Sequence, residues 1–323
     1  MKKHFLYNGR STLNFILNNL DLKKKREILV PDFTCDVLFQ KKKNDNYLFE
    51  FYKIKKNFYF DFKEIEKKIT KNTRAIVIIN FFGIKQNTKK IYEICKKKDI
   101  CLIIDDCHTF YKLKNSINKN CDFIFFSPSK IFPILSNGGI LLEVNKRFLI
   151  KSYSFAKQKN NYFYLLKLIL KRIFYKTSLK FLFKRHNYEN LNAFKSQHLI
   201  KDMNLSASNI NKIKKLNVNQ NKTFRKKNFI FWTKLSKKLN IKPIFKYKEI
   251  KHGLPLFFPA ITKNSKHSSK IFDFGWSNNI DIVSWPTLHS KQKKNKKLVN
   301  YWKQLVFFPM EKKYFLNKDL LDE

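Results

Sequence analysis

The stretch ICLIIDDCHTF, residues 100–110, decides the fold, because an apolar run that ends abruptly in acidic residues is typical of a buried strand. A second wholly apolar run, RAIVIIN at 74–80, precedes it, and a segment with helical periodicity at 88–99 separates the two. Apolar strands that alternate with helices form mainly parallel sheets covered on both faces. The sequence therefore predicts an α/β fold with a mainly parallel central sheet flanked by helices.

The same alternation continues on both sides of this stretch. Helices are expected at 11–20, 61–69 and 88–99, and strands at 27–30, 47–54, 74–80, 100–105, 121–126 and 139–144. Ser11 and Thr12 are the capping candidates of the first helix, and Asp61 opens the second. The length of 323 residues is enough for two domains, so we expect a large domain at 1–205 and a smaller α+β domain at 206–323.

The formal net charge of +44 would ordinarily indicate a polyanionic partner such as a nucleic acid. Only seven of the 68 basic residues are arginines, however, and arginine is the residue that binds phosphates and base edges in a bidentate manner. The lysines are also spread along the whole chain. We therefore interpret the charge as compositional drift and expect no nucleic-acid partner.

The five cysteines form no CxxC pair, and their odd number does not favour a disulfide framework, so a cytoplasmic location is expected. No signal peptide and no transmembrane segment are identified. The segment 161–186 is apolar but interrupted by basic residues. Its pattern favours a helix packed on the domain or on a second subunit, with a basic amphipathic helix on an anionic membrane as the alternative.

Ligands of parallel sheets collect at the carboxyl ends of the strands, and three candidates lie there. Gly9 directly precedes a helix, whose N-terminus can bind an anion. Asp105 ends a strand and is followed by His108; a carboxylate there could hold the protonated nitrogen of a heterocycle, or it could simply cap the following turn. Lys130 follows another strand, where desolvation can make a lysine a nucleophile, although a solvated lysine is the ordinary alternative.

The glycines favour the interpretation of Lys130 as a nucleophile. The chain has only six of them, and four lie at the ends of the strands or loops just described. Glycine is retained where φ must be positive or where a ligand must approach the backbone. We therefore expect these loops to have such a requirement.

Five stretches in this order resemble the DegT/DnrJ-type sugar aminotransferases, which depend on pyridoxal phosphate (PLP) and belong to the aspartate aminotransferase superfamily, fold type I. The stretches are GRSTL (9–13), EILVPDFTCDV (27–37), DFKEIEKKITKNTRAIVIINFFG (61–83), DICLIIDDCHTF (99–110) and FFSPSKIFPILSNGG (125–139). Two later stretches match more loosely, so the resemblance covers nearly the whole chain. It implies a fold type I architecture.

The resemblance also implies a role for each candidate. Lys130 would bind PLP covalently, Asp105 would pair with its pyridine nitrogen, and His108 would lie beside the ring. Ser127 would hold the phosphate together with the backbone at Gly9, Arg10 and Ser11. The resemblance implies no metal. It does imply a homodimer with shared active sites.

The implied reaction transfers an amino group, with glutamate as the expected donor, to a nucleotide-linked keto-sugar used in cell-surface polysaccharides such as lipopolysaccharide. Two alternatives remain: a catalytically divergent protein that keeps the fold as a binding or regulatory partner, and a basic surface-binding protein. Trp276, Trp285 and His289 are conceivable substrate contacts, although tryptophan in a small domain is more often part of the core.

Overall fold

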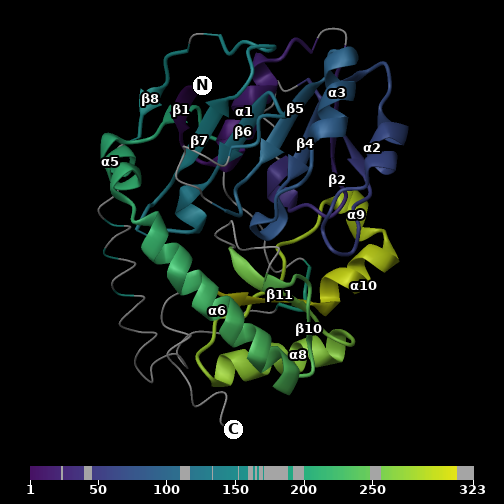
Figure 1. Ribbon diagram of the computed structural model, residues 1–323, viewed down its shortest axis with the longest axis vertical. Helices are drawn as coiled ribbons and strands as arrows, with labels where there is room; N and C mark the ends of the chain where they lie inside the picture. The colour runs from purple at the N-terminus through teal and green to yellow at the C-terminus, as the bar shows by residue number, and fades with distance from the viewer. Residues whose placement is uncertain are drawn as a thin grey trace. The chain divides into compact units, whose positions relative to one another are not determined.

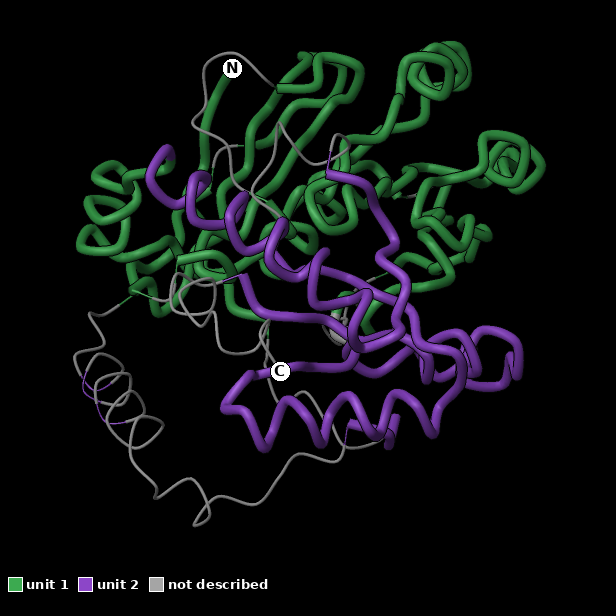
Figure 2. Tube along the Cα trace, turned by 60° about the horizontal axis from the view of Figure 1, so that its bottom comes forward, with its two compact units in different colours: residues 1–158, 197–218 green, residues 159–196, 219–323 purple. Residues whose placement is uncertain are grey.

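A computed structural model describes residues 1–22, 25–39, 46–109, 117–132, 134–151, 153–158, 163, 166, 170, 188–191, 200–247 and 256–310. The chain divides into two compact units, drawn in different colours in Figure 2. Unit 1 comprises residues 1–158 and 197–218, and unit 2 comprises residues 159–196 and 219–323. The sequence predicts a single division after residue 205 instead.

Unit 1 is built on a nine-stranded sheet with the order β3-β2-β4-β5-β6-β7-β1-β9-β8 (Figure 1). The strands are β1 (Lys2–Leu6), β2 (Glu27–Pro31), β3 (Leu48–Tyr52), β4 (Thr73–Ile79), β5 (Cys101–Asp105), β6 (Phe123–Phe126), β7 (Gly139–Glu143), β8 (Ala156–Lys157) and β9 (Met203–Asn204). From β3 to β6 all neighbours are parallel. The predicted α/β fold with a mainly parallel sheet is confirmed.

Helices of unit 1 lie close to the predicted ranges. They are α1 (Gly9–Asn19), α2 (Phe62–Lys68), α3 (Lys89–Lys97) and α5 (Ala207–Lys215), with short 3-10 turns η1 (Asp36–Phe39), η2 (Phe81–Gly83) and η3 (Pro128–Lys130). Asp61 caps α2 as expected, because its side chain accepts a hydrogen bond from Lys63 N–H. The cap of α1 is different from the prediction: Asn8, and neither Ser11 nor Thr12, accepts the first-turn hydrogen bond.

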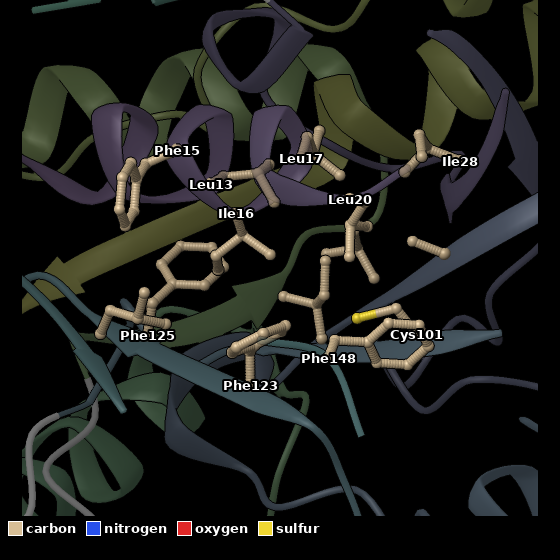
Figure 3. Packing of buried hydrophobic residues seen from close by; sticks show 14 of the residues in the cluster. Leu13, Phe15, Ile16, Leu17, Leu20, Ile28, Cys101, Phe123, Phe125 and Phe148 are labelled. Carbon is tan, nitrogen blue, oxygen red and sulfur yellow. The ribbon is translucent and has the colours of Figure 1, made fainter. Parts of the chain in front are cut away.

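The apolar stripe of α1 covers one face of the sheet. Figure 3 shows Leu13, Ile16 and Leu17 of this helix above Phe123 and Phe125 of β6. Alternate residues of β4 and β5, such as Val77 and Ile103, belong to the same cluster. The residues between them, such as Ile78 and Ile104, point to the opposite face and are also buried. The sheet is therefore covered on both faces, as wholly apolar strands require.

The first strand was not expected from the sequence. β1 pairs antiparallel with β7, and β7 in turn pairs antiparallel with β6, so the parallel core continues into an antiparallel edge. Phe126 faces Ile140 across the β6–β7 pair, which makes the connection 127–138 a closed loop. This loop carries Lys130.

Unit 2 contains a three-stranded antiparallel sheet in the order β10-β11-β12. Its elements are β10 (Lys242–Pro243), β11 (Phe257–Ile261), α8 (Ser265–Ser277), α9 (Ser290–Lys293), α10 (Lys296–Gln304) and β12 (Leu305–Pro309). The long helix α6 (Val218–Lys238) begins at the last residue of unit 1 and continues in unit 2. Trp232 of α6 donates its indole N–H to Pro309 O at 2.7 Å, which ties this helix to β12.

Within the described part of the chain, no helix combines the length and the apolar character needed to cross a membrane. The predicted amphipathic segment 161–186 lies outside the described residues, apart from Phe163, Leu166 and Leu170.

Candidate active site

Asp105 is the last residue of β5, in the middle of the parallel strands. It faces Ile79 of β4 on one side and Phe125 of β6 on the other. Its side chain is 7% exposed and accepts a hydrogen bond from Cys107 N–H at 2.9 Å. Burial raises the pKa of this carboxyl group, and the positive charge of Lys130 acts in the opposite direction. Lys130 follows β6, the strand that pairs with β5 at Asp105.

Lys130 ends the short turn η3 that follows β6. Its backbone N–H donates to Ser127 O at 3.0 Å, and Ile131 and Phe132 N–H both donate to Pro128 O. The side chain is exposed, in contrast to the buried carboxyl group of Asp105. Strand and turn thus fix the backbone of Lys130, while its side chain is free to reach a group placed at the strand ends.

His108 lies beside the turn that follows β4. Its Nδ1 accepts a hydrogen bond from Phe82 N–H at 3.2 Å, so the proton of the neutral ring is on Nε2. Burial lowers the pKa of His108 well below its ordinary value, and the charge of Lys130 lowers it further. His108 is therefore a neutral imidazole at physiological pH, with Nε2–H as its donor.

The turn that binds His108 is strained. Phe82 has φ 53° and ψ 22°, a left-handed conformation that is uncommon for a large side chain. Its ring packs at 5.8 Å from the His108 ring, and Phe81 packs at 6.1 Å. Such strain persists only where the surroundings enforce it, and it is often found at functional sites.

The start of α1 meets the ends of β5 and β6. A Cβ added to Gly9 would lie 2.8 Å from Cys107 Sγ and 3.5 Å from Ser127 Cβ. Ser127 is 4% exposed, and the first turn of α1 lies next to it at Gly9. This cradle of backbone donors, a serine and the positive helix end suits a phosphate group.

One of the predicted phosphate contacts, the backbone N–H of Ser11, has another partner in the described chain. Ser11 N–H donates to Asn8 Oδ1 at 2.9 Å, and Ser11 Oγ accepts from Lys201 N–H at 3.2 Å. Burial lowers the pKa of Arg10, and the nearby Cys35 and Tyr7 act in the opposite direction. The Ser11 N–H is therefore already engaged within the helix start.

A second buried carboxyl group, which the sequence reasoning missed, follows Asp105. Asp106 is 2% exposed, and its Oδ1 accepts a hydrogen bond from Asn80 Nδ2 at 3.0 Å. Burial raises the pKa of Asp106 to about 7, against the Asn80 hydrogen bond and the charge of Lys85, which lower it. Asn80 Oδ1 also accepts from Gln86 N–H at 3.0 Å. The doubled acid in IIDDC and the asparagine after β4 were the available signals.

The remaining candidates lie in unit 2. Trp285 is 6% exposed with its ring 5.8 Å from that of Phe307, and His289 caps α9 by accepting from Lys291 N–H. Trp276 is half-buried in α8. Trp285 thus has the buried position that the sequence offered as its alternative, and His289 has a capping role that the sequence did not predict.

The residues at the strand ends of unit 1 fit PLP. They supply a buried carboxylate for a ring nitrogen, a lysine whose charge acts on that carboxylate, and a phosphate cradle where a glycine admits the backbone closely. Among the described residues, no group of histidine, cysteine and acidic side chains could hold a metal ion.

Known structures share this architecture. PseC of Helicobacter pylori, an aminotransferase involved in the biosynthesis of pseudoaminic acid, is 13% identical with a TM-score of 0.67, over 100% of this chain and 85% of that chain. NtdA of Bacillus subtilis, with bound cofactor PMP, is 15% identical with a TM-score of 0.67, over 100% of this chain and 72% of that chain. The putative sugar aminotransferase Spr1654 of Streptococcus pneumoniae is 14% identical with a TM-score of 0.64, over 100% of this chain and 84% of that chain. At these identities the likeness shows the fold alone.

Part of the sequence matches the model of a known protein family. A comparison with curated protein sequences finds no match. Residues 5–160, which include every candidate of unit 1 at the strand ends, match the profile of the DegT/DnrJ/EryC1/StrS aminotransferase family. The match to this family covers just under half of the chain, and the protein is an aminotransferase that uses PLP.

Proposed function

We propose that this aminotransferase moves an amino group from glutamate to a nucleotide-linked keto-sugar, and that Lys130, Asp105 and His108 are its catalytic residues. One observation supports the assignment of the site: Asp105 ends β5 opposite Phe125 of β6, so all three residues follow the carboxyl ends of two neighbouring parallel strands. Lys130 is therefore the lysine that we assign to the cofactor.

Each residue has a separate task in this proposal. Bound PLP supplies an electron sink for the carbon that loses its proton. The Lys130 amine would hold the cofactor and would act as the base that moves the proton at Cα of the amino donor. The Asp105 carboxylate holds the positive charge on the ring nitrogen, which that electron sink requires. The buried Nε2–H of His108 donates toward the cofactor ring.

The phosphate cradle supports the orientation of the cofactor. Gly9 and Arg10 N–H lie in the first turn of α1, and the Ser127 hydroxyl lies beside them. Because Ser11 N–H already donates to Asn8, we assign the phosphate to the Gly9 and Arg10 N–H groups and to Ser127.

A nucleotide-linked sugar suits the charge of the chain, since its diphosphate is attracted by basic surface. PseC, whose reported role is in pseudoaminic acid biosynthesis, gives precedent for a sugar substrate on this fold. The sugar would be destined for cell-surface polysaccharide. We further propose a cytoplasmic homodimer; the five cysteines are free, as expected in a reducing compartment.

Absorption spectroscopy tests the assignment of Lys130. The protein loaded with PLP should show a visible band that borohydride abolishes, and the reduced cofactor should stay attached to Lys130 after proteolysis. Lys130→Ala should lose the covalent link, whereas Lys146→Ala, which removes an exposed lysine after β7, should retain it. A reducible band that persists in Lys130→Ala would assign the link to another lysine.

The substrate proposal has its own test. Glutamate alone should convert the visible band, and a nucleotide keto-sugar added afterwards should restore it while an amino-sugar is formed. Conversion by glutamate without restoration by any keto-sugar of a broad panel would retain the aminotransferase and reject the sugar acceptor.

A further inference from the structure

Unit 2 contains a cavity of about 190 Å³ that shares no residue with the proposed active site. Aromatic side chains form one part of its wall, and titratable side chains form another. The residues that matter here are Tyr188, Glu189, Lys266, Phe272, Ser284 and Lys303. A volume below the roughly 300–1,000 Å³ of ordinary ligand pockets suits a molecule of about the size of one amino acid.

The polar part of the wall is built from fixed groups. Ser269 Oγ donates to Glu189 Oε1 at 3.1 Å, which holds this carboxylate against α8. The rings of Tyr188 and Phe272 pack at 5.0 Å, so the residue before Glu189 is anchored on the same helix. Glu189 is therefore positioned at the cavity by contacts on both sides.

Ser284 indicates a polar occupant. It is 6% exposed, and its Oγ has no hydrogen-bond partner among the described residues. A buried hydroxyl group without a partner carries a desolvation cost that nothing offsets. A polar group inside the cavity would remove this cost, which a purely apolar ligand would not do.

The charges around the cavity define the ligand further. One carboxylate, Glu189, and two ammonium groups, Lys266 and Lys303, contribute to its wall. A complementary molecule carries one ammonium and two carboxylates, joined by a short apolar chain that can pack on Tyr188 and Phe272. A dicarboxylic α-amino acid has this set of groups.

We propose that this cavity binds a dicarboxylic α-amino acid such as L-glutamate, with its ammonium on Glu189 and its carboxylates on Lys266 and Lys303. The cavity shares no residue with the proposed catalytic site, because all its lining residues belong to unit 2. It does not depend on the proposed function: a change at Lys130 leaves its groups in place.

Isothermal titration calorimetry on the full-length protein, loaded with PLP and treated with borohydride, measures this binding. L-glutamate should bind saturably, and Glu189→Gln should raise its Kd about tenfold to a hundredfold through loss of the charged hydrogen bond. Gln keeps an acceptor for Ser269 Oγ, so the melting temperature of this variant should stay at the wild-type value. Lys303→Met should weaken glutamate by a similar factor, whereas Lys270→Met, an exposed lysine of α8 outside the cavity, should not.

Two analogues separate the charges. Glutarate lacks the ammonium and should bind the wild-type protein as weakly as glutamate binds Glu189→Gln. 4-Aminobutyrate lacks one carboxylate, so its affinity should depend on only one of the two lysines, Lys266 or Lys303. The proposal is overturned if glutamate shows no saturable binding, if glutarate binds as tightly as glutamate, or if Glu189→Gln and Lys303→Met leave the Kd unchanged. Glutamate binding that vanishes in Lys130→Ala and persists in Glu189→Gln would place it at the active site instead.

Discussion

Asp105 and Asp122 are buried carboxyl groups of neighbouring strands, but the chain surrounds them in opposite ways. Asp122 directly precedes β6 and is satisfied by protein: Arg147 at 3.1 Å, Leu102 N–H at 2.9 Å and Tyr92 OH at 3.3 Å. Asp105 ends β5 and accepts from Cys107 N–H, but forms no ion pair with any described residue. A buried charge needs a partner, so the partner of Asp105 is expected to come from a ligand.

The first test of this comparison is catalytic. Asp105→Asn should slow the half-reaction with glutamate by about 10²- to 10³-fold, the range for removing one preorganised electrostatic group. Asp122→Asn should change this rate far less, because Asp122 lies at the opposite end of its strand. Rapid-mixing absorption measurements on the PLP-loaded variants give both rates. Equal losses in the two variants would reject the distinction between a ligand-facing and a structural carboxylate.

The second test measures stability, and here we expect Asp122→Asn to have the larger effect of the two variants. Asp122→Asn leaves Arg147 beside a neutral partner and should lower the free energy of unfolding by about 3 kcal/mol. Asp105→Asn should cause no such loss in the cofactor-free protein, since burial already disfavours its charged form. Urea unfolding of both proteins without cofactor measures the difference.

A third test concerns Asp106, whose pKa is raised by burial to about 7. The folded protein then binds more protons than the unfolded chain, so this group's contribution to stability is greatest at acidic pH and is lost as the pH rises through about 7. Asp106→Asn keeps an acceptor for Asn80 and should increase stability at pH 8 by on the order of 2 kcal/mol. Urea unfolding at pH values from the ordinary pKa of 3.8 to above the raised pKa of about 7 should show a shallower pH dependence in the variant. An unchanged dependence would assign the titration to another group, such as Asp32, whose pKa burial raises to about 6.

The sequence predicted the parallel core because its strands are apolar without interruption, and position past such a strand singled out Asp105 and Lys130. It missed β1, whose KKHFL pattern has exposed lysines and only His4 and Leu6 buried. It also missed the pairing of Asn80 with Asp106, since that contact depends on the register of β4 against β5, with Ile79 opposite Asp105. Contacts between strands need the register, which no local pattern contains.

The smallest expected effects come from alanine substitutions at two glycines of unit 1, Gly9 and Gly138. At Gly9 a new Cβ would lie 2.8 Å from Cys107 Sγ, whereas at Gly138 its nearest neighbour would be Pro128 Cδ at 3.6 Å, an ordinary contact. Gly9→Ala should therefore lower the free energy of unfolding by about 1–3 kcal/mol and weaken cofactor binding, because the helix start must move away from its phosphate cradle.

Gly138→Ala is the matched control, and its free energy of unfolding should stay within about 1 kcal/mol of wild type. Urea unfolding and PLP titration of both variants measure these effects. Since Gly9 and Gly138 both lie outside the left-handed region, backbone conformation does not distinguish them. Equal behaviour of the two variants would mean that scarce glycines are not retained here for close approach, and would remove the support that Gly9 gives to the phosphate site.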